Sequence, residues 1–485
     1  MPPVATPTAP AGPVPAEGDP APPPPAVAGV EAAIPAIGTR LAKAMGRHHD
    51  PRAAIEARMM DRIADRPDLR AAIFRLVDVR PACRDYPDIA EHLAALLDEV
   101  AGRPPEGPVR SGDLPGGELP VPLGLARSLA RRHGSRTLVG VAGAAGVRAM
   151  AGRFIAGEDA ADALPAVRRL WKDGIATSVD LLGEATVSEA EADAYRDRCI
   201  EVLRTLSAGS ARFPARPLLE HDQHGELPRV NLSVKVSALT PHLRAGAPGR
   251  GAASAAPRLR EILRVARDLH AHVHVDMESL DHREAVRDLT LSLLAEPEFA
   301  AGPSAGIVHQ AYLTDAAAEL EVLLGWARRT PRAQPLSIRL VKGAYWDHEV
   351  VEAQQAGWTV PVFTDRRACD REYERLTDTL LDHADLVRPL IASHNLRSVA
   401  HAIAAQRARG LEPDAVEYQV LRGLGDPLAA ALAAEGLRVR TYCPIGDLVA
   451  GMAYLVRRLL ENTANDSFLR AHASGTALDR LLEAP

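Results

Sequence analysis

The sequence is poor in aromatic residues and in cysteine. Phe, Trp and Tyr together make up 4% of the 485 residues, and the four cysteines stand far apart, at positions 83, 199, 369 and 443. Because no two of them form a CxxC pair, their spacing indicates neither a zinc site nor a disulfide framework, and we expect no metal centre. Isolated thiols fit a reducing compartment, so we predict a cytoplasmic protein.

Long apolar runs and an excess of positive charge are also missing. No run of about 18 apolar residues occurs, so we predict no transmembrane helix. The N-terminus lacks a basic segment followed by an apolar core, which argues against a secretory signal. The chain has 57 Lys and Arg against 63 Asp and Glu, a net charge of −6. This balance gives no indication of a nucleic-acid partner.

The N-terminal part of the chain divides into three segments of different composition. Residues 1–29 are almost entirely Pro, Ala, Gly and Val, which predicts a disordered tail. Residues 30–119 are predicted to form a helical arm and a Gly- and Pro-rich linker, and residues 120–175 a helical segment that leads into the next domain. Within the arm, three stretches have apolar residues at helical spacing: Ala53–Ile63, Leu69–Val77 and Ile89–Val100.

Between residues 176 and 470, short apolar runs alternate with amphipathic stretches. Eight runs are predicted strands: Ala176–Leu182, Val230–Ser237, His272–Glu278, Gly306–Leu313, Leu336–Ala344, Leu390–Ser393, Ala415–Leu421 and Arg438–Tyr442. Their nearly continuous apolar character is typical of parallel strands covered on both faces. We therefore predict an α/β fold, a (β/α)8 barrel of the TIM type, followed by a C-terminal tail over 471–485. A doubly wound open sheet is the alternative, but no GxGxxG motif follows a strand.

Polar residues gather toward the ends of these runs, where barrels of this type place their functional groups. The residues are Lys235, Asp276, Glu278, His309, Gln310, Arg339, Lys342, Tyr345, Trp346, Ser393, His394, Asn395, Glu417, Gln419, Arg440 and Tyr442. A single Lys or Gln at such a place is commonly a capping or ion-pairing group. Leaving so many polar groups buried without partners would cost about 1–3 kcal/mol each, so we expect a polar ligand across the barrel mouth.

The segment after the last strand is a predicted helix with a charged face. Tyr454, Arg457, Arg458 and Glu461 follow one another at helical spacing. A solvated surface with an Arg458–Glu461 pair is one interpretation. The other is a clamp for a substrate carboxylate, because two guanidinium groups can bind a carboxylate through paired hydrogen bonds.

These motifs resemble those of the proline dehydrogenase family. The segments are VKVSAL, DMES, QAYL, RLVKGAYWD, ASHN, EYQVLRGLGDP and YLVRRLLEN, in that order. The segment RFIAGEDAADALPAVRRLWKDGIATSVDLLGEA is similar to the start of the barrel in bacterial bifunctional proline utilisation A proteins. The resemblance, over about residues 120–470, implies a distorted barrel that holds FAD and is capped by its last helix. It also implies oxidation of L-proline to delta-1-pyrroline-5-carboxylate, with electrons passed to a membrane quinone.

The resemblance assigns roles to individual residues. Asp276 and Arg339 would be catalytic, with Arg339 close to the flavin. The proline site would contain Lys235, Tyr345, Tyr442, Tyr454, Arg457 and Arg458, with Glu461 bracing the arginine pair. FAD would contact Met277, Gln310, Arg339, Lys342, Gly343, Ala344, Trp346, Ser393, His394 and Asn395.

Several alternatives stay open at this point. Hydroxyproline oxidation is the nearest, although a bulky Tyr442 would crowd a 4-hydroxyl group. An aldolase-like barrel with Lys235 as a Schiff base is another, but it leaves Arg457 and Arg458 unexplained. The chain ends at Pro485, before the aldehyde dehydrogenase domain of the bifunctional relatives. We therefore expect a truncated or split form, or a protein that works with a separate pyrroline-5-carboxylate dehydrogenase. Peripheral contact with the inner face of the membrane is a further hypothesis.

Overall fold

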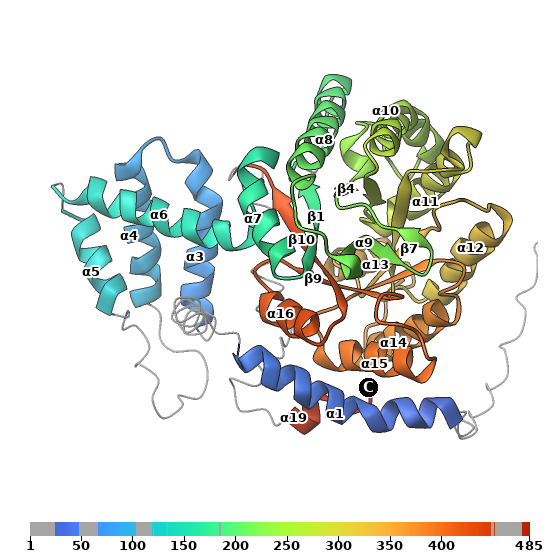
Figure 1. Ribbon diagram of the computed structural model, residues 1–485. Coiled ribbons are helices and arrows are strands. Elements are labelled where there is room, and N and C mark those ends of the chain that lie inside the picture. Colours follow the sequence, from blue (N-terminus) through green and yellow to red (C-terminus); the bar gives the residue numbers. More distant parts are fainter. Residues whose placement is uncertain are drawn as a thin grey trace, which may run out of the picture.

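The protein folds around a closed barrel of parallel strands (Figure 1). The computed structural model describes residues 25–47, 66–102, 119, 121–132, 134–183, 186–447, 451 and 478–485. Around the barrel the strand order is β1-β10-β9-β8-β7-β6-β5-β4. The strands are β1 (Ile175–Leu181), β4 (Asn231–Val234), β5 (His272–Val275), β6 (Ser304–Gln310), β7 (Ser337–Val341), β8 (Arg388–Ala392), β9 (Glu417–Leu421) and β10 (Arg438–Ile445). Each predicted strand overlaps one of these, so the predicted (β/α)8 barrel is confirmed.

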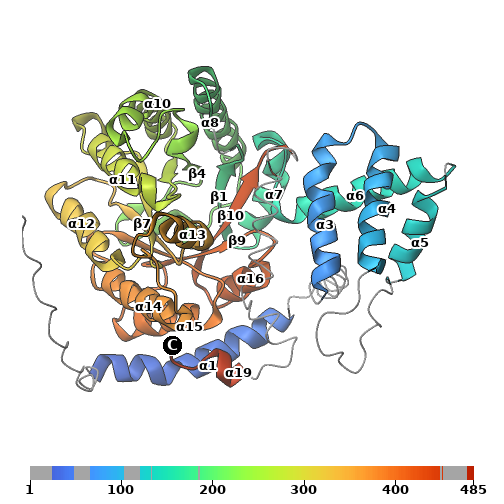
Figure 2. The ribbon, with the colours of Figure 1, turned by 180° about the vertical axis from the view of Figure 1, so that it is seen from behind.

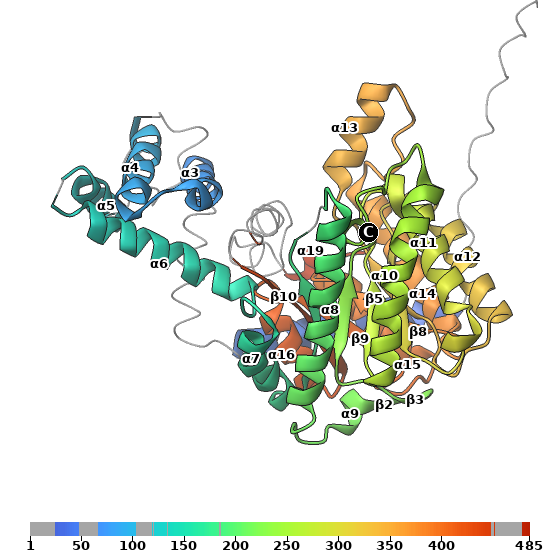
Figure 3. The same ribbon diagram turned by 90° about the horizontal axis from the view of Figure 1, so that it is seen from above.

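Helices follow the strands and cover the barrel from outside. They are α8 (Glu189–Ser210), α10 (Pro248–Asp268), α11 (Leu280–Leu294), α12 (Ala316–Arg329), α13 (Trp346–Ala356), α14 (Arg366–Asp382), α15 (Leu396–Ala408) and α16 (Asp426–Ala434). The sequence did not predict α13, because this helix buries only Glu349 and Ala353 and therefore has no apolar stripe. It projects at one end of the barrel, whereas α9 (Pro217–Glu220) and the hairpin of β2 (His221–Asp222) and β3 (Gly225–Glu226) lie at the other end (Figure 3).

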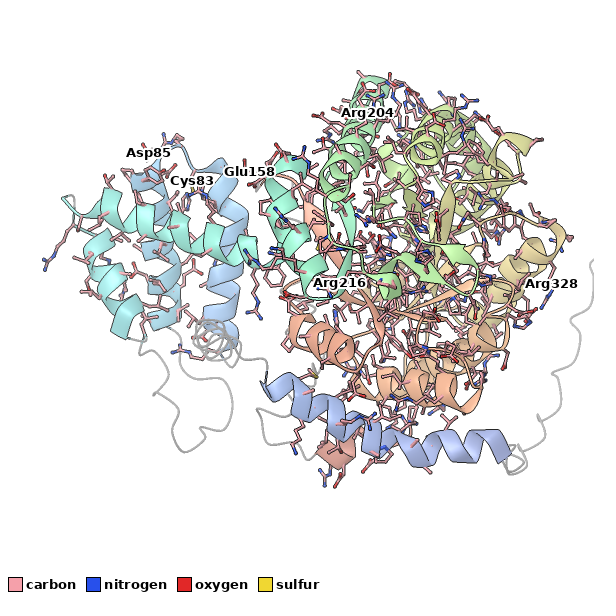
Figure 4. All side chains as sticks on the ribbon, in the orientation of Figure 1. Cys83, Asp85, Glu158, Arg204, Arg216 and Arg328 are labelled. Carbon is pink, nitrogen blue, oxygen red and sulfur yellow. The ribbon has the colours of Figure 1, made fainter. Side chains whose placement is uncertain are left out.

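The interior of the barrel is polar. Branched aliphatic side chains fill most barrels of this type, and here residues such as Leu232 and Val273 instead face the helices as part of the apolar core. The alternating inward positions carry buried polar groups: Ser178, Asp180, Asn231, Ser233, His272, His274, Ser304, Ser337, Arg339, Arg388, Glu417, Gln419, Arg438 and Arg440. Other charged side chains, such as Arg204 on α8 and Arg328 on α12, lie on the outside (Figure 4). Charges inside the barrel must therefore neutralise one another.

Two residues that the sequence placed near the barrel mouth lie deep inside it. Glu417 is the first residue of β9, and its carboxylate accepts hydrogen bonds from Arg440 Nε and Nη2 at 2.8 and 2.9 Å. Arg440 Nη1 also donates to the carbonyl of Thr177 at 2.8 Å. These groups satisfy each other, so the expectation that they need a bound ligand was wrong.

His309 is a second correction. Side chains alternate along a strand, and Gln310 and His309 of β6 therefore cannot both face the barrel interior. His309 is buried and lies on the outer side, where it contributes with Leu323 of α12 to a small cavity between strand and helices. Burial lowers the pKa of His309 to about 4, so its ring is neutral.

The N-terminal helix α1 (Pro25–Arg47) runs along α15 and α16 (Figure 1). Its residues Ile34, Ile37 and Leu41 are buried against the barrel helices. The helix includes residues 25–29, which the sequence assigned to a disordered tail. That prediction was wrong there because proline is well tolerated in the first turn of a helix.

A separate helical unit stands beside the barrel (Figure 2). It comprises α3 (Pro67–Val79), the short η1 (Arg80–Ala82), α4 (Tyr86–Gly102), α5 (Val121–Ala130) and α6 (Arg136–Phe154), and α7 (Ala160–Lys172) connects it to β1. Gly140 lets α6 touch α4, because a Cβ there would lie 1.8 Å from the carbonyl oxygen of Tyr86. The predicted helix Ala53–Ile63 lies outside the described residues. Within the described ranges, no helix has the length and apolar character needed to cross a bilayer.

We predict that Glu417→Gln destabilises the barrel and alters its acid sensitivity. Burial opposes ionisation of Glu417, but Arg440 outweighs it and lowers the pKa of the carboxyl to about 2. A depressed pKa contributes stability above the ordinary value of 4.5, and this stability is lost as the pH falls toward about 2. Breaking such a buried pair costs about 3–5 kcal/mol.

Urea unfolding of the parent and the variant at several pH values measures both effects. The fall in the free energy of unfolding below pH 4.5 should be shallower in the variant. The exposed Glu412→Gln is the control and should leave the pH dependence unchanged. An identical acid dependence in the parent and in Glu417→Gln would contradict the assignment.

Candidate active site

Asp276 is the centre of a hydrogen-bonded network at the carboxyl ends of the strands. It directly follows β5, and its Oδ1 accepts a hydrogen bond from Arg339 Nη1 at 2.8 Å. Its Oδ2 accepts one from Tyr442 Oη at 2.7 Å. The Arg339 guanidinium also donates to Ser233 Oγ at 3.2 Å and to Ser178 Oγ at 3.3 Å. Side chains from β1, β4, β7 and β10 are thus connected through one carboxylate and one guanidinium.

Lys235 forms the second ion pair of this network. Its Nζ lies 2.5 Å from Asp180 Oδ1 and 3.9 Å from Asp276 Oδ2. Burial lowers the pKa of Lys235, but the two carboxylates outweigh burial and hold the pKa above its ordinary value. Burial raises the pKa of Asp180, and the Lys235 ammonium opposes this rise. With Arg339 and Asp276, the site has two cations and two carboxylates.

Asp180 and its neighbour Ser178 were missed by the sequence analysis. Both lie at inward positions of β1, two residues apart, in the run TSVDL. Ser233 and Lys235 repeat this spacing at β4. The spacing of two was the signal that could have identified Asp180, because a charged residue at an inward position of a buried strand requires a partner across the barrel.

Tyr442 supports the guanidinium of Arg339. The Arg339 Cζ lies 5.4 Å from the centre of the Tyr442 ring, within the range of a cation–π contact. Burial first, and then the charges of Asp180 and Asp276, raise the pKa of the Tyr442 hydroxyl well above its ordinary value. The hydroxyl therefore remains protonated and acts as a donor to Asp276.

The turn after β7 contains Lys342, Gly343 and Ala344. The Lys342 ammonium is hydrogen-bonded to Asp370 and lies 5.7 Å from the centre of the Tyr373 ring. Gly343 has a φ of +140°, and a Cβ there would lie 2.4 Å from the ring of Tyr312. Only glycine suits this turn, which brings the backbone close to the barrel mouth.

Hydrogen bonds also fix the turn that follows β8. Asn395 caps α15 by accepting a hydrogen bond from the Ser398 amide at 3.1 Å. Ser393 Oγ accepts one from the Asn395 amide at 3.1 Å, and His394 Nε2 accepts one from the Leu421 amide at 2.9 Å. These bonds fix three consecutive predicted residues at the N-terminal end of a helix, where the helix dipole favours anions.

The remaining predicted residues differ in their surroundings. Gln310 is buried; its Nε2 donates to the Glu278 carbonyl at 3.0 Å, while its Oε1 has no hydrogen-bond partner among the described residues. Met277 is partly buried against the apolar core, and Tyr345 precedes α13. Trp346 donates to the Phe363 carbonyl and is 39% exposed.

The structure brings four of the predicted residues into direct contact and places the others on neighbouring turns. Lys235, Asp276, Arg339 and Tyr442 form the connected network described above. The cofactor candidates lie within or just after β5, β6, β7 and β8, which are adjacent in the barrel. The four predicted residues of the closing helix, Tyr454, Arg457, Arg458 and Glu461, lie outside the described residues.

Comparison with known families identifies the chain. Residues 163–471 match the family described as proline dehydrogenase, and residues 31–111 match the proline utilization A N-terminal domain. The first match covers more than half of the 485 residues, so the chain belongs to the proline dehydrogenase family.

Some similar proteins are longer than this chain and others are shorter. The bifunctional protein PutA of Klebsiella aerogenes is 34% identical over 347 residues, which are 70% of this chain and 25% of that protein. Proline dehydrogenase 1 of Bacillus subtilis is 28% identical over 69% of this chain and 94% of that protein. The crystal structure of PutA from Bdellovibrio bacteriovorus inactivated by N-propargylglycine has a TM-score of 0.81 and 31% identity, covering 94% of this chain and 44% of that one.

We predict that Asp180→Asn destabilises the protein by about 3–5 kcal/mol, because it leaves the buried Lys235 ammonium without its nearest counter-charge. Combining it with Lys235→Met should restore much of this loss, since the two residues form one pair. Urea unfolding of the two single variants and of the double variant measures the coupling free energy between the two residues. The exposed Asp197→Asn on α8 is the control. If the losses of the two single variants simply add, the pair is not coupled.

Proposed function

We propose that this chain oxidises L-proline to delta-1-pyrroline-5-carboxylate, the first step of proline catabolism to glutamate, with FAD as hydride acceptor and a membrane quinone as final acceptor. The observation that carries the proposal is the Asp276–Arg339–Tyr442 network beside Lys235, in a chain of the proline dehydrogenase family. We assign Asp276 and Arg339 to the catalytic centre. Because both Asp276 oxygens accept hydrogen bonds, its part is to hold Arg339 and Tyr442 in place rather than to remove a proton.

The residues after β6, β7 and β8 fit an anionic dinucleotide. Gln310 contributes a buried acceptor that has no partner among the described residues, Gly343 a turn that admits no side chain, and residues 393–395 the positive end of α15. FAD, when bound, supplies the hydride acceptor, and a cation such as Arg339 stabilises the negative charge that this transfer creates. We propose the full set to be Met277, Gln310, Arg339, Lys342, Gly343, Ala344, Trp346, Ser393, His394 and Asn395.

The charge balance of the mouth supports a substrate clamp on the closing helix. Lys235 and Arg339 are already neutralised by Asp180 and Asp276. A bound amino-acid carboxylate would add one negative charge, so its binding calls for further cations. We propose that Arg457 and Arg458 supply them and that Lys235, Tyr345, Tyr442 and Tyr454 shape the pocket.

The same geometry disfavours the aldolase-like alternative. A Schiff-base lysine must be neutral to attack a carbonyl, whereas the carboxylates of Asp180 and Asp276 raise the pKa of Lys235. Hydroxyproline oxidation remains the second candidate, since a hydroxyproline dehydrogenase of Xenopus laevis is 29% identical over 42% of this chain. We propose L-proline because Tyr442, fixed by Asp276, would crowd a 4-hydroxyl group.

The proposal also includes a partner enzyme and a route to the quinone, which the longer relatives suggest. This chain spans about a quarter of the curated PutA proteins that it matches. We propose a separate pyrroline-5-carboxylate dehydrogenase as the partner that consumes the product, and peripheral contact with the inner face of the membrane as the route to the quinone.

We expect the purified protein to contain flavin and to lose its visible absorbance when L-proline is added without oxygen. A dye-reduction assay with L-proline and 4-hydroxyproline distinguishes the two substrates, and L-proline should give the higher kcat/KM. A folded protein that takes up no flavin would exclude the cofactor assignment. Efficient reduction by 4-hydroxyproline alone would favour the second candidate.

We expect Arg458→Ala to raise the KM for proline by a factor of about 10–200, because a charge-assisted hydrogen bond contributes about 1.5–3 kcal/mol. Flavin content should not change. Arg480→Ala, on the C-terminal helix α19 (Leu478–Leu481), is the matched control. An unchanged KM for Arg458→Ala would refute the clamp.

A further inference from the structure

The end of the barrel opposite the mouth has a charged floor. Seven of the eight strands contribute their first residue to it, among them Asn231, Ser304, Arg388, Glu417 and Arg438. These residues surround a cavity of about 20 Å³, and the third residue of β10, Arg440, also borders it. The cavity is at the end of α9, β2 and β3, away from α13 (Figure 3).

Two of the three floor arginines have a carboxylate of their own. Arg440 forms the paired hydrogen bonds with Glu417 described above. Arg388 donates from Nε and Nη2 to the two oxygens of Asp222 at 2.7 and 3.2 Å, and from Nη1 to Gln334 at 2.9 Å. Both floor carboxylates are therefore fully engaged.

Arg438 is the surplus cation. Its side chain is 2% exposed, and its Nη1 has one long hydrogen bond to Asp222 Oδ2, at 3.3 Å. Its Nε lies 3.8 Å from Glu417 Oε2 and has no hydrogen-bond partner within the described ranges. Three guanidinium groups thus face two carboxylates.

Neighbouring side chains do not correct this imbalance. His272 and His274, the nearest titratable groups of β5, are buried and have their pKa values lowered well below the ordinary value, so they are neutral. Arginine does not lose its proton in proteins. An unpaired charge removed from water costs several kcal/mol, which a counter-ion in the cavity would offset.

We propose that the floor cavity binds one small monovalent inorganic anion, of the chloride class, against Arg438. The guanidinium supplies the charge, and the amide of Asn231 and the hydroxyl of Ser304 supply neutral donors at the cavity wall. A water molecule needs roughly 10–15 Å³ of such space, so a cavity of about 20 Å³ suits one small ion and excludes a large organic anion. The anion neutralises the base of the barrel.

Thermal unfolding of the full-length holoprotein tests this proposal. At constant ionic strength, replacing sodium gluconate by sodium chloride should raise the unfolding midpoint in proportion to the logarithm of the chloride concentration once the site saturates. Arg438→Gln should abolish this dependence. Arg287→Gln removes an arginine that pairs with Glu319 on the outside of the barrel and should retain it.

A direct observation complements the variants, in case Arg438→Gln does not fold. In crystals of the parent protein grown with bromide, an anomalous-scattering peak should lie between Arg438 and Asn231. Coincident chloride and gluconate curves together with no peak would mean that the cavity holds water alone. A chloride dependence that persists in Arg438→Gln would place the anion elsewhere. Either result overturns the proposal.

Discussion

Charges buried inside the barrel require counter-charges, and this constraint organises the molecule from floor to mouth. Removing one partner of such a pair costs several kcal/mol, whereas the intact pair is close to neutral in its net contribution. At the mouth, Asp276 pairs with Arg339 from a strand two places away around the barrel. At the floor, Glu417 pairs with Arg440 on the adjacent strand. The pairs therefore favour one register of the strands over those that would separate the partners.

The same constraint explains why the site is selective for what it can bind. Among the described residues, the network of Lys235, Asp180, Arg339 and Asp276 has equal numbers of cations and carboxylates and therefore attracts little further charge by itself. In our proposal the charge of the ligand is met by Arg457 and Arg458 of the segment after β10, which lie outside the described residues. Preorganised pairs such as Arg339 with Asp276 hold their positions without reorganisation when a ligand enters.

Much of the fold and part of the candidate site could be predicted from local sequence patterns. The apolar runs of the eight strands are each shorter than a typical helix and bounded by polar turns, so the barrel followed from them directly. Asp276, Arg339 and Tyr442 were found because each belongs to a recognisable motif. Asp180 was not, since its only signal is an inward position in a short strand. The predicted positions of His309 and Glu417 were wrong because the sequence of a strand shows neither which face of the strand a side chain is on nor how deep in the barrel it lies. Helix α13 and the early start of α1 depended on surroundings that no local pattern encodes.

The contacts of Arg397 bear on how another polypeptide could be fused to the C-terminus of this chain. Its guanidinium binds Glu31 of α1, Glu374 of α14 and the carbonyl of Leu482 near the C-terminus. Helix α1 and the last residues thus meet on one flank of the barrel, beside α15 (Figure 1). Because Arg397 is the second residue of α15 and closely follows the turn of residues 393–395, a polypeptide fused after Pro485 would leave from the mouth end of this flank. A tag or tether attached at that point would therefore lie close both to the contact between Arg397 and α1 and to the turn after β8.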